Sequence, residues 1–299
     1  MDKKTACAHI PPDTHFSYTT RDAIIYALGV GARVKEDLRY IYENSDNFQV
    51  LPSYVVAPGF ASMSLMDWPG IDFDLQRILH GEQYIEVYNP LPEEGNLRSE
   101  ARVVDIVDKG SFALILCDVT TYDEATGKKI STQQFSTFQS GSGNFGGERT
   151  SVHEKKTVPI PTRAPDAVVE QKTSVDQAGL YRMAGGDLNP LHVDPNFAKM
   201  SGFKTPILHG LGTFGFATRH VLATWGGNDA SKFKAMKVRF SSPVIPGQTL
   251  VTETWKDGNR IIFQTKVKET GKTVISNSYM DLHEASAKPT IQDGLDSKL

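Results

Sequence analysis

Runs of alternating apolar and polar residues occupy the last third of the chain. They cover residues 234–240, 249–256, 260–268 and 273–282, and Pro-Gly, Asp-Gly and Thr-Gly dipeptides separate them. Alternation over about four to eight positions between turn-forming dipeptides predicts strands with one buried face. Similar runs at residues 84–88, 97–107, 112–122 and 129–138 predict a matching set of strands in the first half.

Helical spacing replaces the alternation just before the later set of strands. Residues 210–225 place Leu211, Phe214, Val221 and Trp225 on one side of a helix, which predicts a long helix with one apolar face. The corresponding region of the first half, residues 56–66, is interrupted by proline and glycine, so we expect a weaker helix and room for a long apolar ligand. Helices packed on antiparallel strands indicate an α+β fold.

A faint internal repeat relates the two halves. Residues 20–31 align with residues 175–186, with three residue types in step, Ala23 with Ala178, Tyr26 with Tyr181 and Gly31 with Gly186. Two later matches follow in the same order, 89–95 with 242–247 and 126–130 with 270–274. We infer two copies of one architecture. The aperiodic, glycine- and proline-rich residues 139–164 form the linker, which gives an N-terminal half at 1–155, a C-terminal half at 156–284 and a flexible tail at 285–299.

Composition excludes several classes of protein. The 299 residues are 39% hydrophobic and 22% charged with a formal net charge of -3, which is ordinary for a globular protein and gives no reason to expect nucleic acid or an anionic membrane as a partner. No apolar run approaches the ~20 residues of a membrane span. The two cysteines form no disulfide framework, and Cys117, inside the apolar run 112–119, is expected to be a buried small residue.

Candidate chemistry is concentrated in residues 181–194, YRMAGGDLNPLHVD. Two glycines end a helix at Gly186 and Asn189-Pro190 keeps the backbone out of helix, so Asp187, Asn189 and His192 lie on a loop. A carboxylate and an imidazole on one bent loop can share a water molecule, one accepting its proton while the other orients it or returns a proton. The alternative is that Asp187 caps a turn and His192 is a core histidine.

Two further kinds of site compete with an acid/base pair. Asp187, His192, Asp194 and His209 are possible metal ligands, but their spacing matches no common motif and we expect no metal. Nucleophilic hydrolysis has less support because the chain contains no Gly-x-Ser-x-Gly.

The start of the long helix offers a second functional group. Gly210 follows His209 there, and the first amides of a helix have no intrahelical acceptor, so its N–H is a candidate oxyanion donor. A plain helix-start glycine is the alternative. Beside an acid/base pair, such a donor suits the addition of water to a double bond conjugated to a carbonyl.

The signature GDLNPLHVD at 186–194, followed by ILHG at 207–210, resembles that of the MaoC-like R-specific enoyl-CoA hydratases, including the hydratase domains of type 2 peroxisomal multifunctional enzymes. The resemblance implies a double hot-dog fold, two antiparallel sheets each wrapped around a helix, with catalytic residues only in the second half. It implies Asp187 and His192 as the acid/base pair, Asn189 as a supporting group and the Gly210 amide as oxyanion donor. Ala32 stands where the repeat would place Asp187.

The resemblance also implies residues along the path of the CoA thioester. His80, Gly81 and Lys109 match such positions in the first half, and Phe240 matches an apolar contact in the second. We also assign Leu188, Pro190 and Leu191 of the signature to substrate binding. Plainer roles compete, since His80 could cap a helix, Lys109 could be a solvated turn residue and Phe240 could belong to the core.

We therefore expect a hydro-lyase of peroxisomal β-oxidation that converts trans-2-enoyl-CoA to (3R)-3-hydroxyacyl-CoA without a cofactor, CoA being part of the substrate. A non-catalytic acyl-CoA binding protein and an acyl-CoA thioesterase are the alternatives. The C-terminal tripeptide Ser297-Lys298-Leu299 predicts the peroxisome and its import receptor. A homodimer is expected by resemblance. The chain has no Gly-x-Gly-x-x-Gly opening a βαβ unit, so a stand-alone hydratase and a fragment of a larger enzyme both remain open.

Overall fold

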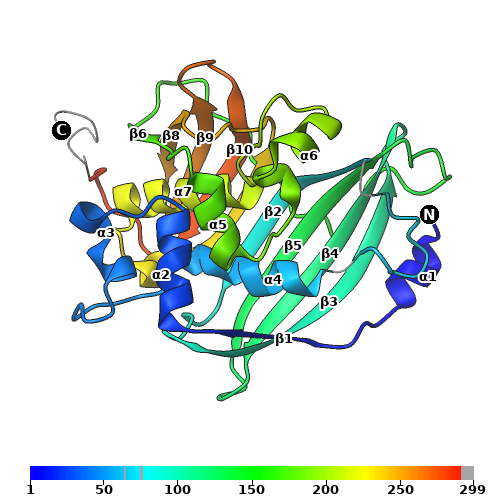
Figure 1. The fold of residues 1–299 in the computed structure, drawn as a ribbon, viewed down its shortest axis with the longest axis horizontal. Coiled ribbons are helices and arrows are strands. Elements are labelled where there is room, and N and C mark those ends of the chain that lie inside the picture. Colours follow the sequence, from blue (N-terminus) through cyan, green and yellow to red (C-terminus); the bar gives the residue numbers. More distant parts are fainter. Residues whose placement is uncertain (64, 75–76, 291–299) are drawn as a thin grey trace.

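One antiparallel sheet frames the molecule, and helices lie along its inner side (Figure 1). The computed structural model describes residues 1–63, 65–74 and 77–290. The strands are β1 Thr14–Tyr18, β2 Ile78–Val87, β3 Gly95–Asp108, β4 Phe112–Asp123, β5 Lys129–Ser140, β6 Ala167–Lys172, β7 Phe233–Phe240, β8 Thr249–Asp257, β9 Arg260–Val267 and β10 Thr273–Leu282. The α-helices are α1 Lys3–Ala8, α2 Thr20–Gly29, α3 Val34–Ile41, α4 Val56–Ser62, α5 Gln177–Gly185, α6 Pro195–Met200 and α7 Gly210–Trp225. Short 3₁₀ helices are η1 Pro52–Val55, η3 Pro190–His192 and η4 Ala230–Lys232.

The ten strands form a single sheet in the order β1-β3-β4-β5-β2-β7-β10-β9-β8-β6. Each half has the same internal order, because β6-β8-β9-β10-β7 repeats β1-β3-β4-β5-β2. The halves join where β2 pairs with β7, with Tyr84 opposite Lys237. The expected α+β class is confirmed, but the expectation of two separate sheets is wrong. Pairing β2 with β7 satisfies the main-chain groups that two separate sheets would leave at their edges.

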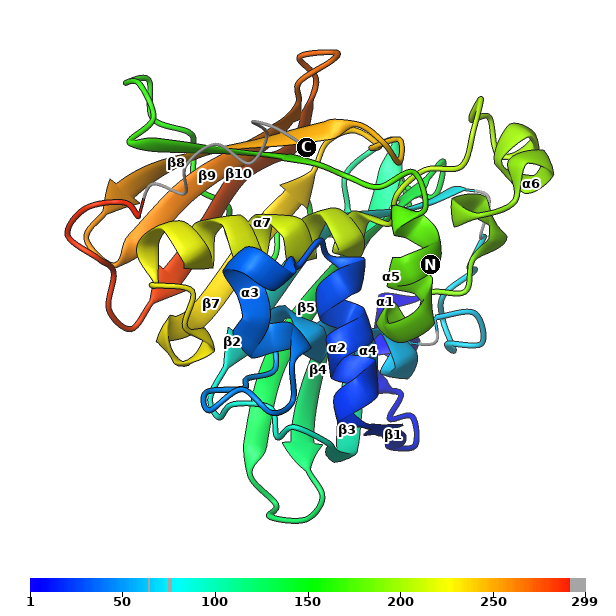
Figure 2. The same cartoon turned by 60° about the vertical axis from the view of Figure 1, so that its left-hand side comes forward.

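The long helix α7 begins and ends at the predicted residues, but it is more deeply enclosed than its sequence pattern indicates. Fifteen of its sixteen residues are buried, so the expected single apolar face is wrong. The end of α2 also packs against α7, since a Cβ on Gly215 would lie 2.3 Å from Val30. Figure 2 shows α7 running between the sheet and the helices α2 and α3. The second layer of helices explains why no face of α7 reaches solvent.

The central helix of the first half is short, as its interrupted pattern predicts. α4 has seven residues, against sixteen in α7. Beyond α4, buried Leu65, Trp68 and Ile71 pack on a separate apolar cluster of the first-half sheet. The indole N–H of Trp68 donates to the main-chain oxygen of Ala6, 2.9 Å away, which holds α1 against this segment.

The repeat is visible in how α2 and α5 pack together. Gly29 lies so close to α5 that an added Cβ would be 2.9 Å from the Cα of Tyr181, and the rings of Tyr26 and Tyr181 are 6.0 Å apart. Gly31 and Gly186 follow these helices with φ of +81° and +79°, in the left-handed region that favours glycine. Two equivalent helices therefore end in two equivalent turns.

A buried polar network fills the first-half position that corresponds to the second-half loop. The guanidinium of Arg219 donates to the main-chain oxygen of Val30, to Gln171 and to the carboxylate of Asp37. The amide of Gln171 donates to the main-chain oxygen of Gly31, 2.7 Å away. These bonds close the turn at Gly31, so side chains from both halves occupy the space beside it.

His220 extends this network and makes stability depend on pH. Its Nε2 lies 3.0 Å from Gln171 Oε1 and its Nδ1 2.9 Å from Thr252 Oγ1. Gln171 Oε1 only accepts, so Nε2 carries the proton and Nδ1 accepts from the threonine hydroxyl. Burial, together with the nearby Arg219 charge, lowers the pKa of His220 to about 3, so the folded protein holds this imidazole neutral.

We expect the unfolding free energy to fall as the pH drops below the ordinary histidine pKa, because the unfolded chain then binds a proton at His220 that the folded chain does not. The loss from His220 is about 2 kcal/mol between about pH 7 and pH 5. Denaturant titrations at both pH values, on the wild type and His220→Gln, measure it. The variant is expected to lose that much less stability on acidification, and an identical pH dependence in both proteins would contradict the assignment.

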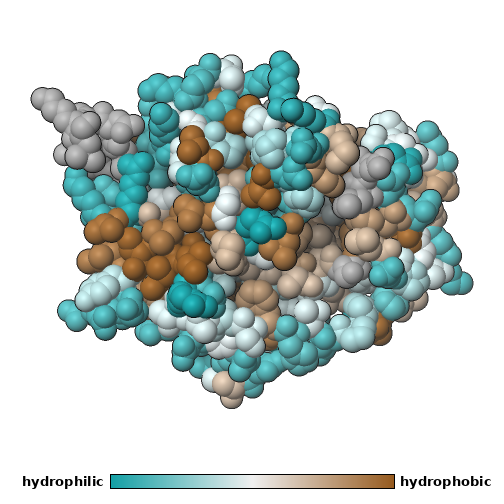
Figure 3. Space-filling view, in the orientation of Figure 1, coloured by the Kyte–Doolittle hydropathy of each residue, from teal (hydrophilic) through white to brown (hydrophobic). Residues whose placement is uncertain are grey.

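The surface over α2 and α3 is apolar (Figure 3). Leu28, Val34 and Leu38 are exposed there, while Asp37 of α3 points inward to Arg219.

The sequence pattern predicted neither α3 nor the edge strands β1 and β6. Within the described residues, no helix combines the length and hydrophobicity needed to cross a membrane.

Candidate active site

The loop after α5 is held in shape by its own side chains. The carboxylate of Asp187 accepts the amide of Asn189 at 3.0 Å through Oδ1, and Asn189 Oδ1 accepts the amide of Leu191 at 3.0 Å. Pro190 then starts η3, which ends at His192. Asp187 therefore does cap a turn, but with one oxygen only, and its Oδ2 remains for other contacts.

The bent loop brings Asp187 and His192 together. Asp187 Oδ2 lies 3.5 Å from Nε2 of His192. The other ring nitrogen, Nδ1, lies 2.8 Å from the main-chain oxygen of Ile207. A carbonyl oxygen only accepts hydrogen bonds, so Nδ1 carries a proton and Nε2 faces the carboxylate with its lone pair or a second proton. The His192 side chain is 9% exposed and that of Asp187 is 22% exposed, so the pair is partly shielded but reachable.

Opposing effects set the charge of Asp187. Burial raises its pKa, but the hydrogen bonds with His192 and with the Asn189 amide outweigh burial, so the net pKa lies below the usual aspartate value. Asp187 is a carboxylate at neutral pH. It can accept a hydrogen bond from water and stabilise positive charge on His192.

His209, which the sequence offered beside Asp187 and His192 only as a possible metal ligand, is a member of this group. It precedes α7, its ring stacks on His192 with centroids 3.6 Å apart, and its Nε2 lies 3.1 Å from the main-chain oxygen of Asp187. Burial and the neighbouring His192 lower the pKa of His209 to about 3, so it is neutral. Its separation from the loop in sequence follows no local period, and only the ILHG signature marks the position.

The geometry favours acid/base chemistry over metal binding. Ligand atoms of Asp187, His192 and His209 lie within 4.8 Å of one another, but the two imidazoles are stacked, with 26° between their planes. Lone pairs lie in the ring planes, so stacked rings do not direct them at one ion. Nδ1 of His192 and Nε2 of His209 already face carbonyl oxygens. Asp194 lies outside this cluster and caps α6 by accepting the Asn196 amide at 2.8 Å.

Side chains from both halves surround the exposed start of α7. Gly210 is the first residue of the helix, so its amide has no acceptor within the helix. Phe240, at the end of β7, lies 3.5 Å from where a Cβ on Gly210 would be. The ring of His80, from β2, meets Phe240 edge-on with centroids 5.2 Å apart. The β2–β7 junction therefore places a first-half histidine beside the second-half loop.

A chain of side-chain amides holds His80 in place. Its Nε2 lies 3.0 Å from Gln83 Oε1, while the Gln83 amide donates to Gln133 and the Gln133 amide donates to the main-chain oxygen of Val55. Burial lowers the pKa of His80 to about 4, although the nearby carboxylate of Asp187 opposes the shift. His80 lies in a strand, so the alternative that it caps a helix is wrong.

The other residues expected to contact the substrate differ in burial and in their neighbours. Gly81 lies at a register shift in β2, where an added Cβ would be 1.9 Å from the Phe138 ring, so packing alone requires glycine there. Lys109 is in the β3–β4 turn with Nζ 3.8 Å from the Glu154 carboxylate. In the loop, Leu191 is half-buried, while Leu188 and Pro190 are exposed. Their roles in binding stay predictions.

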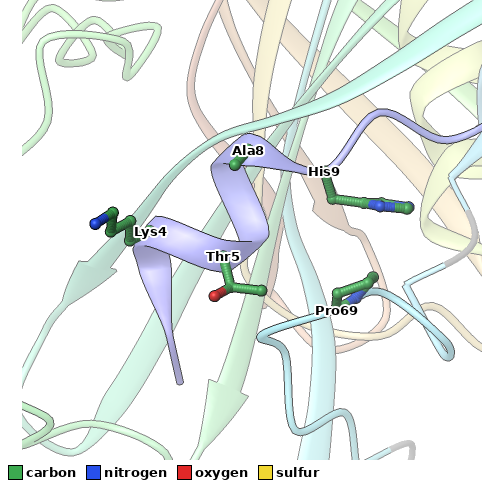
Figure 4. A pocket seen from close by; sticks show the side chains of 5 residues that line it. All are labelled: Lys4, Thr5, Ala8, His9 and Pro69. Atoms are coloured by element: carbon green, nitrogen blue, oxygen red, sulfur yellow. The ribbon is translucent and has the colours of Figure 1, made fainter.

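A surface depression beside α1 is lined by Lys4, Thr5, Ala8, His9 and Pro69 (Figure 4). His9 packs edge-on against Trp68 with centroids 5.1 Å apart. None of the residues expected to act in the reaction lines this depression.

Two family models cover most of the chain. The MFE-2 hydratase 2 N-terminal domain matches residues 16–141 and the MaoC like domain matches residues 156–278. The chain is 54% identical over 291 residues to peroxisomal multifunctional enzyme type 2 of Mus musculus, covering 95% of this chain and 39% of that enzyme. The chain thus spans well under half the length of this relative.

A relative of similar length is the peroxisomal enoyl-CoA hydratase 2 of Arabidopsis thaliana. It is 38% identical over 295 residues, which cover 94% of this chain and 95% of the relative. Among solved structures, Rv0216 of Mycobacterium tuberculosis, described as a double hotdog fold, matches with a TM-score of 0.54 at 13% identity, over 92% of this chain and 97% of that one. This likeness shows the fold, and the single continuous sheet is how this chain forms it.

Proposed function

The chain belongs to the MaoC-like enoyl-CoA hydratase 2 family, and on this premise we propose that it adds water to trans-2-enoyl-CoA to give (3R)-3-hydroxyacyl-CoA. The observation that carries the proposal is the Asp187–His192 pair, 3.5 Å apart, beside the first amide of α7, which has no acceptor within the helix. The family is one of hydro-lyases and includes peroxisomal enzymes, and we propose that this chain acts in fatty-acid β-oxidation.

In the proposed reaction a water molecule binds between Asp187 and His192. Nε2 of His192 takes one proton from the water as the hydroxyl attacks C3 of the enoyl group, and the Asp187 carboxylate accepts the other water hydrogen as a hydrogen bond. The imidazolium then returns its proton to C2, so the net addition is one water. The carboxylate stabilises the imidazolium while it exists, and the Ile207 carbonyl keeps the ring oriented.

The thioester oxygen needs its own support. As hydroxyl adds to C3, electron density moves through C2 onto this oxygen, and a donor that meets the developing charge lowers the barrier. We assign this donor to the Gly210 amide, supported by its place at the exposed start of α7. Phe240 and His80 would border the enoyl group, and Asn189 holds the loop that carries the pair.

We also propose a peroxisomal location, supported by the peroxisomal relatives. Ser297, Lys298 and Leu299 lie outside the described residues, so the import receptor stays a sequence prediction. A homodimer and the boundaries at residues 155 and 284 also stay proposals. The seven-residue α4 supports the proposal that the first half accepts long acyl chains.

Product analysis tests the function. We expect the purified chain to hydrate both crotonyl-CoA and trans-2-decenoyl-CoA, and chiral chromatography to give the (3R) product. An acyl-CoA binding protein would bind both without turnover, and a thioesterase would release free CoA, which a thiol reagent detects. Either result, or a (3S) product, would contradict the proposal.

A further inference from the structure

His209 joins the Asp187–His192 loop to the start of α7. Its ring lies against two others, with centroids 3.6 Å from His192 and 4.8 Å from Tyr181. Its Nε2 lies 3.1 Å from the main-chain oxygen of Asp187, and the residue is 1% exposed. The His209 side chain thus contacts the loop at Asp187 and at His192, and His209 is also the residue that directly precedes Gly210.

The hydrogen bond defines the form of this imidazole. A carbonyl oxygen accepts only, so Nε2 of His209 carries the proton and Nδ1 holds a lone pair. Within the described part of the chain, Nδ1 is buried without a hydrogen-bond partner. The charged or titratable groups that face the ring are Asp187 and His192 from the loop and Tyr181 and Arg182 from α5. Such a neutral ring adds no charge that would oppose an imidazolium at His192.

An apolar ring would fill the same space without leaving a polar atom unpaired, and burying an unpaired acceptor costs free energy. Packing alone therefore does not explain a histidine here. The Nε2–H donor is what histidine supplies and phenylalanine does not, and its acceptor is the main-chain oxygen of Asp187 itself.

We propose that His209 is a positioning residue, which fixes the Asp187–His192 pair relative to the Gly210 amide through its hydrogen bond to Asp187 and its stack on His192. The inference rests on the proposed function, because it concerns the same reaction. Water between the pair must reach C3 while the thioester oxygen reaches the amide. A misplacement of about 1 Å between such groups costs about a hundredfold in rate.

Two variants separate the donor from the ring. His209→Phe keeps an aromatic ring between His192 and Tyr181 but removes the donor, whereas His209→Gln places an amide N–H near the position of Nε2. We expect His209→Phe to lower kcat about a hundredfold with KM within about twofold of wild type, and His209→Gln to recover most of that loss. His283→Gln, at an exposed histidine after β10, is the matched control and is expected to behave as wild type.

Wild-type kcat in His209→Phe would overturn the proposal, and so would a His209→Gln variant as slow as His209→Phe. Thermal unfolding of each variant is measured in parallel, because a merely structural role would lower the midpoint and leave kcat of the folded enzyme unchanged.

A second measurement does not need turnover. In protein with ¹⁵N-labelled imidazoles, we expect two-dimensional NMR to give the Nδ1–H form of His192 in wild type and in His209→Gln, and a mixture of tautomers in His209→Phe. An unchanged His192 spectrum in His209→Phe would overturn the positioning role. A wild type that gives no hydration would instead overturn the proposed function, so the two failures are distinguishable.

Discussion

Replacing Asp187 by asparagine is expected to lower kcat for enoyl-CoA hydration about a thousandfold while the protein stays folded. The amide is almost isosteric, and its oxygen can still accept the Asn189 amide that now bonds to Asp187 Oδ1. What it loses is the negative charge 3.5 Å from Nε2 of His192. Without that charge, the water is less firmly oriented and the imidazolium is less stable. Initial rates with crotonyl-CoA, followed by loss of enoyl absorbance, measure the effect.

Asp194→Asn is the matched control for this variant. Asp194 is an exposed residue of the same segment, its carboxylate caps α6, and it lies outside the acid/base group. Its replacement is expected to leave kcat near wild type and to cost at most about 1 kcal/mol of stability through the weakened cap. An Asp187→Asn enzyme with wild-type kcat would refute the assigned role. Equal losses of kcat in both variants would instead point to a general effect on the loop.

The largest effect on stability is expected at the junction of the two halves. Glu82 of β2 is 2% exposed, and its carboxylate lies 2.7 Å from Nζ of the fully buried Lys237 and 2.7 Å from the guanidinium of Arg239. Burial lowers the pKa of Lys237, and Glu82 opposes that shift. Glu82→Gln leaves the buried ammonium without its counter-charge, so we expect a loss of about 3–5 kcal/mol in the unfolding free energy.

Two comparisons isolate the buried charge as the cause. Glu170→Gln removes the exposed partner of Lys268 and is expected to cost less than about 1 kcal/mol. Adding Lys237→Met to Glu82→Gln removes the unpaired charge as well, and is expected to recover much of the lost stability. Denaturant unfolding at neutral pH gives the unfolding free energy of these three variants relative to the wild type. If Glu82→Gln were no more harmful than Glu170→Gln, the junction would not depend on this ion pair.

Short-range patterns predicted most of the second half correctly. The helical period of α7 and the alternation in β7 to β10 are local properties. So are the helix-ending turns at Gly31 and Gly186, where the backbone is left-handed and favours glycine. The edge strands β1 and β6 were missed because each is short and pairs along one side only, so neither carries a long alternating run. Their places are set by pairing with β3 and β8.

The residues of the candidate site also fall into those that local sequence predicts and those that only the fold brings in. Asp187 and His192 were predicted to meet because Gly186 and Pro190 bend one short segment, which is a local property. His209 approaches the loop from the start of α7, and His80 comes from the other half across the β2–β7 pairing, so neither neighbour follows from spacing along the chain. Gly81 was expected to line a substrate path, yet its contact with Phe138 gives it a packing role that no motif contains.

The helix and strand periods, and the loop that carries a carboxylate and an imidazole, follow from the sequence alone because each depends on residues close together in the chain; the two-fold repeat follows from comparing two such local patterns. Three features follow only from the folded chain: the two halves share one sheet, Arg219 and Asp37 close the first-half turn, and a neutral His209 stacks on His192. These features depend on packing and burial between segments distant in sequence, where a buried polar group must find a partner wherever the fold places one.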